Sequence, residues 1–185
     1  MSVVSMHDNA ARRRTFLSGI LFSDEGNKLR KQAAFWLGQN DDDVEALRLL
    51  EKTALNDHSA EVRKQAVFAI SEMHTTAAEN VLIELAQNRE DTEIRKEAIF
   101  WLAQKASKRA IATLKEALED DGETEVQKHA VFALTQLSDN EGIPILIDIA
   151  KNHRSRVVRK EAIFWLGQSD DPRAVATLVK IVREQ

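Results

Sequence analysis

The stretch IRKEAIFWLAQ, residues Ile94–Gln104, recurs in four near-copies, and this recurrence decides the fold. The other copies are LRKQAAFWLGQ (Leu29–Gln39), VRKQAVFAISE (Val62–Glu72), VQKHAVFALTQ (Val126–Gln136) and VRKEAIFWLGQ (Val158–Gln168). The lysines of the five copies stand at 31, 64, 96, 128 and 160, so the period is 33 residues once and 32 residues thereafter. A fixed period of this size is typical of solenoid proteins, which present an extended surface.

Each copy has the pattern of an amphipathic helix. With the lysine as position 0, apolar residues fall at −2, +2, +3 and +6, which is one stripe of a helix. A second apolar segment at helical spacing follows each copy, as in Ile143, Leu146 and Ile149. We therefore expect inner helices at 28–39, 60–73, 93–105, 125–137 and 156–168, and outer helices between them.

The predicted fold is an all-α, right-handed α/α superhelical solenoid of about five helical hairpins in a single domain, residues 1–185. An outer helix at about 10–22 precedes the first copy. A final outer helix at 173–184 follows Asp171-Pro172, a sequence typical of an N-cap and a first helical residue. Its apolar residues have no repeat after them, so we expect either a longer array or an end that packs on a partner, with end-to-end self-association as one form of this.

Composition excludes several classes of protein. The chain has no cysteine, so disulfides and thiolate metal sites are excluded, and its net charge of −4 argues against a dedicated nucleic-acid binder. No apolar run approaches the ~20 residues of a membrane span, so no membrane partner is expected. Arg13-Arg14 resembles an export motif, but the apolar stretch after it ends at Ser23. We interpret this segment as a basic first helix and favour a cytoplasmic location because no complete signal peptide is present.

The fifth copy resembles a known family. Val158-Arg159-Lys160-Glu161-Ala162 through Leu166-Gly167, followed by Asp171-Pro172-Arg173-Ala174, is similar to the HEAT repeats of the short, phycobilin-lyase type (PBS lyase HEAT-like). The resemblance extends over nearly the whole chain after residue 28. It implies an armadillo-like α/α superhelix whose second helices line a concave face, and it implies binding more often than catalysis.

The Lys–Phe–Gln face is the recurring surface, formed by positions 0, +4 and +8 of the inner helices, away from the apolar stripe. A phenylalanine at +4 occurs in all five copies and can meet a ligand or pack against the next repeat, two possibilities of equal weight. The residues expected to bind a partner are Lys31, Phe35, Lys64, Phe68, Lys96, Phe100, Gln104, Lys128, Phe132, Gln136, Lys160 and Phe164. We expect those of the three central copies to line one continuous groove.

Two further positions are interpreted as structural. Position +5 alternates between tryptophan (Trp36, Trp101, Trp165) and alanine, which predicts tryptophans more buried than the lysines and packed against neighbouring repeats. Arginine at −1 lies within the apolar stripe and requires a partner. The expected partners are carboxylates in loops, and the candidates are Asp42, Asp43, Asp139 and Asp171.

Catalysis is not expected. Deoxyhypusine hydroxylase has similar short repeats, and that resemblance would imply His-Glu pairs holding two irons. The corresponding pairs here are Lys31-Gln32, Lys64-Gln65, Lys96-Glu97, Lys128-His129 and Lys160-Glu161. Lysine does not replace histidine as an ordinary iron ligand, so the sequence predicts no metal, no cofactor and no catalytic residue.

The function predicted is that of a non-enzymatic scaffold for protein–protein interaction. It would hold an acidic or amphipathic segment of a partner protein on the Lys–Phe–Gln face, with apolar contact from phenylalanine and hydrogen bonds from glutamine. One alternative is binding of a nucleic-acid phosphate backbone by the lysines. Another is a role as accessory subunit of a chromophore lyase complex.

Overall fold

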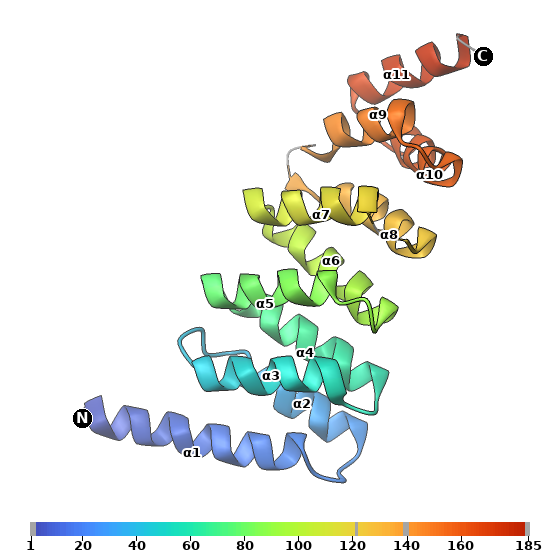
Figure 1. The fold of residues 1–185 in the computed structure, drawn as a ribbon. Helices are drawn as coiled ribbons and strands as arrows, with labels where there is room; N and C mark the ends of the chain where they lie inside the picture. The colour runs from blue at the N-terminus through green and yellow to red at the C-terminus, as the bar shows by residue number, and fades with distance from the viewer. Residues whose placement is uncertain (1–2, 121, 139–140, 184–185) are drawn as a thin grey trace. The chain divides into compact units, whose positions relative to one another are not determined.

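The computed structural model describes residues 3–120, 122–138 and 141–183, with side chains for 9–119, 122–138 and 141–183. These residues form eleven α-helices and no β-strand (Figure 1). The inner helices, which contain the five copies, are α2 (Asn27–Leu37), α4 (Ala60–Glu72), α6 (Thr92–Lys105), α8 (Thr124–Leu134) and α10 (Arg156–Gly167). The outer helices are α1 (Val3–Leu21), α3 (Val44–Asn56), α5 (Thr76–Gln87), α7 (Lys108–Asp120), α9 (Gly142–Asn152) and α11 (Pro172–Arg183).

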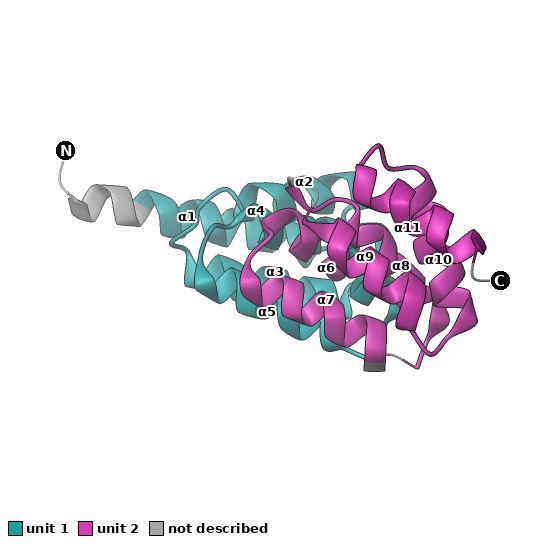
Figure 2. Cartoon of the chain, turned by 90° about the horizontal axis from the view of Figure 1, so that it is seen from above, with its two compact units in different colours: residues 1–97 teal, residues 98–185 magenta. Residues whose placement is uncertain are grey.

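The chain divides into two compact units, residues 1–97 and 98–185, and the boundary falls within α6 (Figure 2). In unit 1, α4 packs on its own outer helix α3, on the preceding inner helix α2 and on α5. The residues that carry this packing are those of the predicted stripe, because Val62, Ala66, Val67 and Ile70 are fully buried. Burial of such a stripe is the main source of helix stability in a folded protein.

Unit 2 repeats the same arrangement. The inner helix α10 packs on its own outer helix α9, on the preceding inner helix α8 and on α11. In α8 the stripe residues Val126, Ala130 and Val131 are fully buried, and Leu134 is nearly so. Alternating outer and inner helices, stacked hairpin on hairpin, confirm the all-α helical-repeat class that the period predicted.

The two end helices differ in how closely they follow the sequence pattern. The helix α11 begins at Pro172, and Asp171 Oδ1 accepts a hydrogen bond from the Arg173 backbone N–H, as the N-cap motif predicted. The helix α1 begins at Val3, earlier than expected. Its Arg14, part of the possible export motif, binds both carboxylate oxygens of Asp43 at 2.7 and 2.8 Å and so attaches α1 to the start of α3.

Among the residues that the structure describes, none of the helices combines the length and the apolar character that crossing a membrane requires.

Candidate functional site

Phenylalanines of successive inner helices stack on one another. The rings of Phe35 and Phe68 in unit 1 lie 6.4 Å apart with planes 7° from parallel. Phe100 and Phe132 in unit 2 repeat this geometry at 6.3 Å and 10°. All four side chains are half-buried, so each ring packs against a neighbouring repeat and also presents an edge or face to solvent. The packing predicted for this position is thus present, and part of each ring remains accessible to a ligand.

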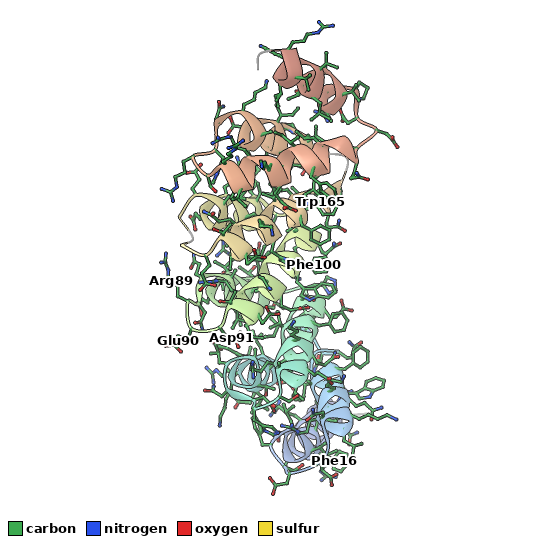
Figure 3. All side chains as sticks on the ribbon, turned by 90° about the vertical axis from the view of Figure 1, so that its right-hand side faces the viewer. Phe16, Arg89, Glu90, Asp91, Phe100 and Trp165 are labelled. Atoms are coloured by element: carbon green, nitrogen blue, oxygen red, sulfur yellow. The ribbon has the colours of Figure 1, made fainter. Side chains whose placement is uncertain are left out.

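The tryptophans at +5 stand edge-on to the phenylalanine of their own helix, with ring centroids 5.0–5.2 Å apart in α2, α6 and α10. Trp165 also lies 5.1 Å from Phe132 of the preceding inner helix, and Figure 3 shows Phe100 and Trp165 on the same side of unit 2. Trp101 and Trp165 are half-buried, as are most of the lysines.

The predicted burial is wrong for Trp36, which is 56% exposed and thus more exposed than Lys31 beside it. The physical reason is its place in the array. Position +5 faces the preceding inner helix, as the contact between Trp165 and Phe132 demonstrates. In the part of the chain that the structure describes, no inner helix precedes α2.

The lysines are paired with glutamates at position −3 of the inner helices. Lys31 Nζ lies 3.0 Å from Glu61 Oε2. Lys64 Nζ lies 2.8 Å from Glu93 Oε2. Each of these pairs joins one inner helix to the next. Lys96 binds Glu93 at 2.5 Å within its own helix, and Lys128 binds Glu125 at 3.2 Å in the same way.

These pairs change the electrostatics expected for the Lys–Phe–Gln face. Four of the five lysines have a carboxylate partner, so they do not form a row of free cations. Hydrogen bonds from Lys64 and then Lys96 lower the pKa of Glu93 from its ordinary value of 4.5 to about 2. The hydrogen bond with Glu93 is in turn the main cause of the raised pKa of Lys64. Glu93 thus remains ionised at neutral pH and neutralises the centre of the row. The signal was available in the sequence, because glutamate occupies −3 in three successive copies.

Position +8 is the most accessible row of this face. Its side chains belong to the last turn of each inner helix or to the residues just after it, and all five are exposed. Gln136 Nε2 donates a 2.9 Å hydrogen bond to Thr135 Oγ1, which leaves its carbonyl oxygen available to a partner. The row consists of Gln39, Glu72, Gln104, Gln136 and Gln168.

Two of the arginines at −1, Arg30 and Arg63, join successive repeats through buried or half-buried ion pairs. Arg30, which is 2% exposed, binds Asp57 at 2.6 Å. Arg63 lies 3.1 Å from Asp91, in the loop before α6 that Figure 3 labels beside Arg89 and Glu90. Asp57 and Asp91 each precede the next inner helix, so the pairing spans a repeat junction. The structural role predicted for these arginines has the geometry it requires.

For Arg30 and Arg63, the predicted partners are wrong. Asp43 binds Arg14 instead, Asp171 binds Arg173 at 2.7 Å, and Asp139 lies outside the described residues. Asp42 takes part in none of the ion pairs found among the described side chains. The predicted carboxylates lie in loops that follow an inner helix. The observed carboxylates lie in the loops that precede the next inner helix.

The fourth copy replaces this ion pair with hydrogen bonds to a carbonyl. It carries Gln127 in place of arginine, and Gln127 Nε2 donates to the Leu118 carbonyl oxygen at 2.9 Å. The loop between α9 and α10 carries His153 at the position that Asp57 occupies before α4. His153 Nε2 lies 2.9 Å from the same carbonyl oxygen. Arg154 also donates to the Glu119 carbonyl. Arginine and aspartate are thus both absent at this junction, and the end of α7 receives the donors instead.

A cleft in unit 2 adjoins the face. Its volume is about 570 Å³, and it lies between the C-terminal ends of α8 and α10 and the starts of α9 and α11. Trp165 and Gln168 of the inner-helix surface line it together with Leu134 and Pro172. The cleft therefore extends the apolar surface of the Lys–Phe–Gln face toward the loops. Among the described side chains, no group of three or more His, Cys, Asp or Glu residues could hold a metal ion.

Comparison with models of protein families identifies known repeats along the chain. The model of HEAT repeats matches residues 15–103 and 79–157, and the model of the PBS lyase HEAT-like repeat matches residues 158–184. A search of curated proteins finds no match. Matches of this kind are typical of scaffolds for protein interaction, and the two models together extend over the five copies.

Two solved structures have a similar fold. One is from the complex of CpcE and CpcF of phycocyanin lyase from Nostoc sp. PCC7120, at 20% identity and TM-score 0.53, covering 92% of this chain and 70% of that chain. The other is YibA of Escherichia coli, at 24% identity and TM-score 0.53, covering 91% of this chain and 64% of that chain. The repeat models match well over half of the sequence, and the helical hairpins agree with them: the chain belongs to the HEAT-repeat family.

Proposed function

We propose that this protein is a non-enzymatic scaffold that binds a segment of a partner protein on the Lys–Phe–Gln face of its inner helices. The observation that carries the proposal is the exposed aromatic surface in successive repeats. Phe35 with Phe68, and Phe100 with Phe132, stack in pairs that remain half-exposed. Ordered aromatic rings with accessible surface are the type of side chain that dominates binding energy at protein interfaces.

The row at +8 supplies the polar part of this interface. Glutamine carries both donors and an acceptor, so Gln39, Gln104 and Gln136 can hydrogen-bond the backbone of an extended or helical segment. Hydrogen bonds at the rim and apolar contact at the centre are the usual anatomy of an interface. Specificity would then come from the fit of apolar side chains between the rings.

The paired lysines modify the partner first expected. Because Glu61, Glu93 and Glu125 neutralise lysines of the face, a strongly acidic partner would gain little from it. The same pairing argues against the phosphate backbone of a nucleic acid as the ligand, since that mode requires free cations in a row. An amphipathic segment with apolar anchors is the partner that this face suits best.

A role as accessory subunit of a chromophore lyase complex is the other candidate. The likeness to the chain from the complex of CpcE and CpcF is at 20% identity, a level that carries the fold and leaves the function open. The side chains of the face are compatible with a protein partner in either role.

Affinity capture from an extract of the source cells, with three forms of the protein, tests the proposal. Gln104→Arg places a bulky cation on the face, and Asn80→Arg makes the same change in charge on the outer helix α5, where the residue is also exposed. A partner retained by wild type and Asn80→Arg but lost by Gln104→Arg supports the proposal. A partner lost equally by both variants, or by neither, contradicts it.

A further inference from the structure

The last two helices of unit 2 expose an apolar surface. On α11, Val175, Val179 and Val182 are 52%, 45% and 76% exposed, and they fall on one side of the helix. On the adjoining α10, Phe164 is 55% exposed. An exposed group of four large apolar side chains on two packed helices is unusual for a solvated surface.

This surface corresponds to the one that earlier inner helices bury against the next repeat. At +3, Val67 and Val131 are fully buried, whereas Ile163 of α10 is only half-buried. At +7, a Cβ added to Gly38 would lie 2.4 Å from the Ala69 carbonyl oxygen of the next inner helix, whereas one added to Gly167 would meet no atom within 4 Å. The far side of α10 therefore has the shape of a repeat junction without the helix that would complete it.

Within the part of the chain that the structure describes, the cations on α10 also lack the carboxylate partners that their counterparts have in earlier repeats. Lys31 and Lys64 bind Glu61 and Glu93 of the next inner helix, but Lys160 has no carboxylate partner among the described side chains. The neighbouring Arg159 also lacks, among the described side chains, the ion pair that Arg30 and Arg63 make.

Arg30 and Arg63 bind Asp57 and Asp91, which precede the next inner helix. Among the described side chains Arg159 has no carboxylate partner, and it donates to the backbone carbonyls of His153 and Arg154 at 2.5 and 3.1 Å. Two adjacent cations therefore stand beside an apolar surface, each without the carboxylate that its counterparts bind.

We propose that the surface formed by Phe164, Val175, Val179 and Val182 (the terminal face) docks an amphipathic helix from a partner protein, one with carboxylates in its first turn and in the residues just before it. The apolar stripe of that helix would cover the valines and Phe164. Its first carboxylates would meet Arg159 and Lys160, in the manner of Asp91 with Arg63 and Glu93 with Lys64. This surface shares Lys160 and Phe164 with the Lys–Phe–Gln face, but the proposal does not depend on the function proposed for that face.

A second copy of this chain does not fit the terminal face. Among the described residues no inner helix precedes α2, which carries Lys28 at −3. The inner helices that bind a lysine of the preceding repeat carry Glu61 and Glu93 at this position. Lys28 would face Lys160 and repel it. The helix α1 also packs on α2 and would meet α11 at the position of the outer helix. The occupant that we propose is a helix of another protein.

A labelled peptide tests this site. The probe copies residues 90–105 of this chain, which contain Asp91, Glu93 and a complete inner-helix stripe, with a fluorescent group at its N-terminus. Fluorescence anisotropy against the full chain should give saturable binding, with a Kd on the order of 10–100 µM because a short free peptide must fold to bind. Val179→Asp together with Val182→Asp should weaken binding at least about tenfold without changing the helical circular dichroism.

Charge exchange separates this site from binding elsewhere. Lys160→Glu should weaken the probe about fivefold, and a probe carrying Glu93→Lys should recover affinity for that variant to within about twofold of wild type. Lys28→Glu makes the same charge change on α2 and should leave binding unchanged.

Three results would overturn the proposal: no saturable binding, binding indifferent to both the valine and the Lys160 substitutions, or a dimer in sedimentation that Val179→Asp dissociates. The dimer would identify a second copy as the occupant.

Discussion

Lys64 Nζ lies 2.8 Å from Glu93 Oε2, and these two residues belong to successive inner helices of the array. The contact repeats that of Lys31 with Glu61 one repeat earlier. Lys31 and Lys64 thus contribute to the junctions between repeats. In the proposed binding role, they would contact a partner through their aliphatic stems and remaining donors.

The pairing of Glu93 predicts a dependence of stability on pH. Its pKa is about 2 in the folded protein and near 4.5 when its lysine partners are absent, so its contribution is complete above pH 4.5 and is lost as the pH falls toward 2. Glu93→Gln should therefore lose less stability than wild type over that interval. Urea titrations at several pH values measure this, with Glu72→Gln as an exposed control. If the free energy of unfolding fell equally steeply with decreasing pH in Glu93→Gln and in wild type, the low pKa of Glu93 would be contradicted.

The two glycines at +7 should respond oppositely to alanine. Gly38→Ala forces a Cβ to within 2.4 Å of the Ala69 carbonyl oxygen, and overpacking of this kind costs about 1–3 kcal/mol. Gly167→Ala has open space around it and should gain up to about 1 kcal/mol from helix propensity. Thermal melts of the two variants make the comparison. A stabilising Gly38→Ala would refute the close approach of these two inner helices.

The tryptophans should differ in their contribution to stability. Trp165 contacts both Phe132 and Phe164, and Trp165→Ala should cost about 2 kcal/mol, below the ~3–5 kcal/mol typical of a fully buried aromatic residue. Trp36 is 56% exposed, so Trp36→Ala should cost less than about 1 kcal/mol. Chemical denaturation measures both values. Equal losses of stability in the two variants would show that the position of a tryptophan in the array does not determine its contribution to stability.

The helices could be predicted because the apolar stripe is repeated five times without interruption. Val62, Ala66, Val67 and Ile70 define one side of α4 unambiguously, and each further copy restates the same pattern. The sequence Asp171-Pro172 likewise indicated the start of α11, which begins at Pro172, one residue before the predicted range of 173–184. Local periodicity and capping chemistry determine these features, and both are visible in one sequence.

Contacts between repeats were harder to predict, because they depend on how far one hairpin is displaced along the next. Arg30 reaches Asp57, 27 residues later, and no helical periodicity determines which loop will provide that carboxylate. Trp36 illustrates a second difficulty. Its sequence environment matches that of Trp165, and only its place at the first repeat makes it exposed.

Nucleic acid should bind weakly at most. Four of the five lysines of the Lys–Phe–Gln face have carboxylate partners, and the net charge of the chain is −4. Anisotropy with labelled single- and double-stranded DNA, titrated with salt, should show no complex at physiological ionic strength. A tight complex that weakens steeply with salt would establish the phosphate-binding alternative instead.

Site-specific photocrosslinking tests the binding role of the Lys–Phe–Gln face most directly. A photoreactive benzoylphenylalanine is placed at Gln104 or Gln136 on the face, or at Asn80 on α5 as control, and the living source cells are irradiated. The account predicts the same discrete crosslinked protein at Gln104 and Gln136 and none at Asn80. Crosslinks absent from both face positions, or equally strong at Asn80, would contradict it.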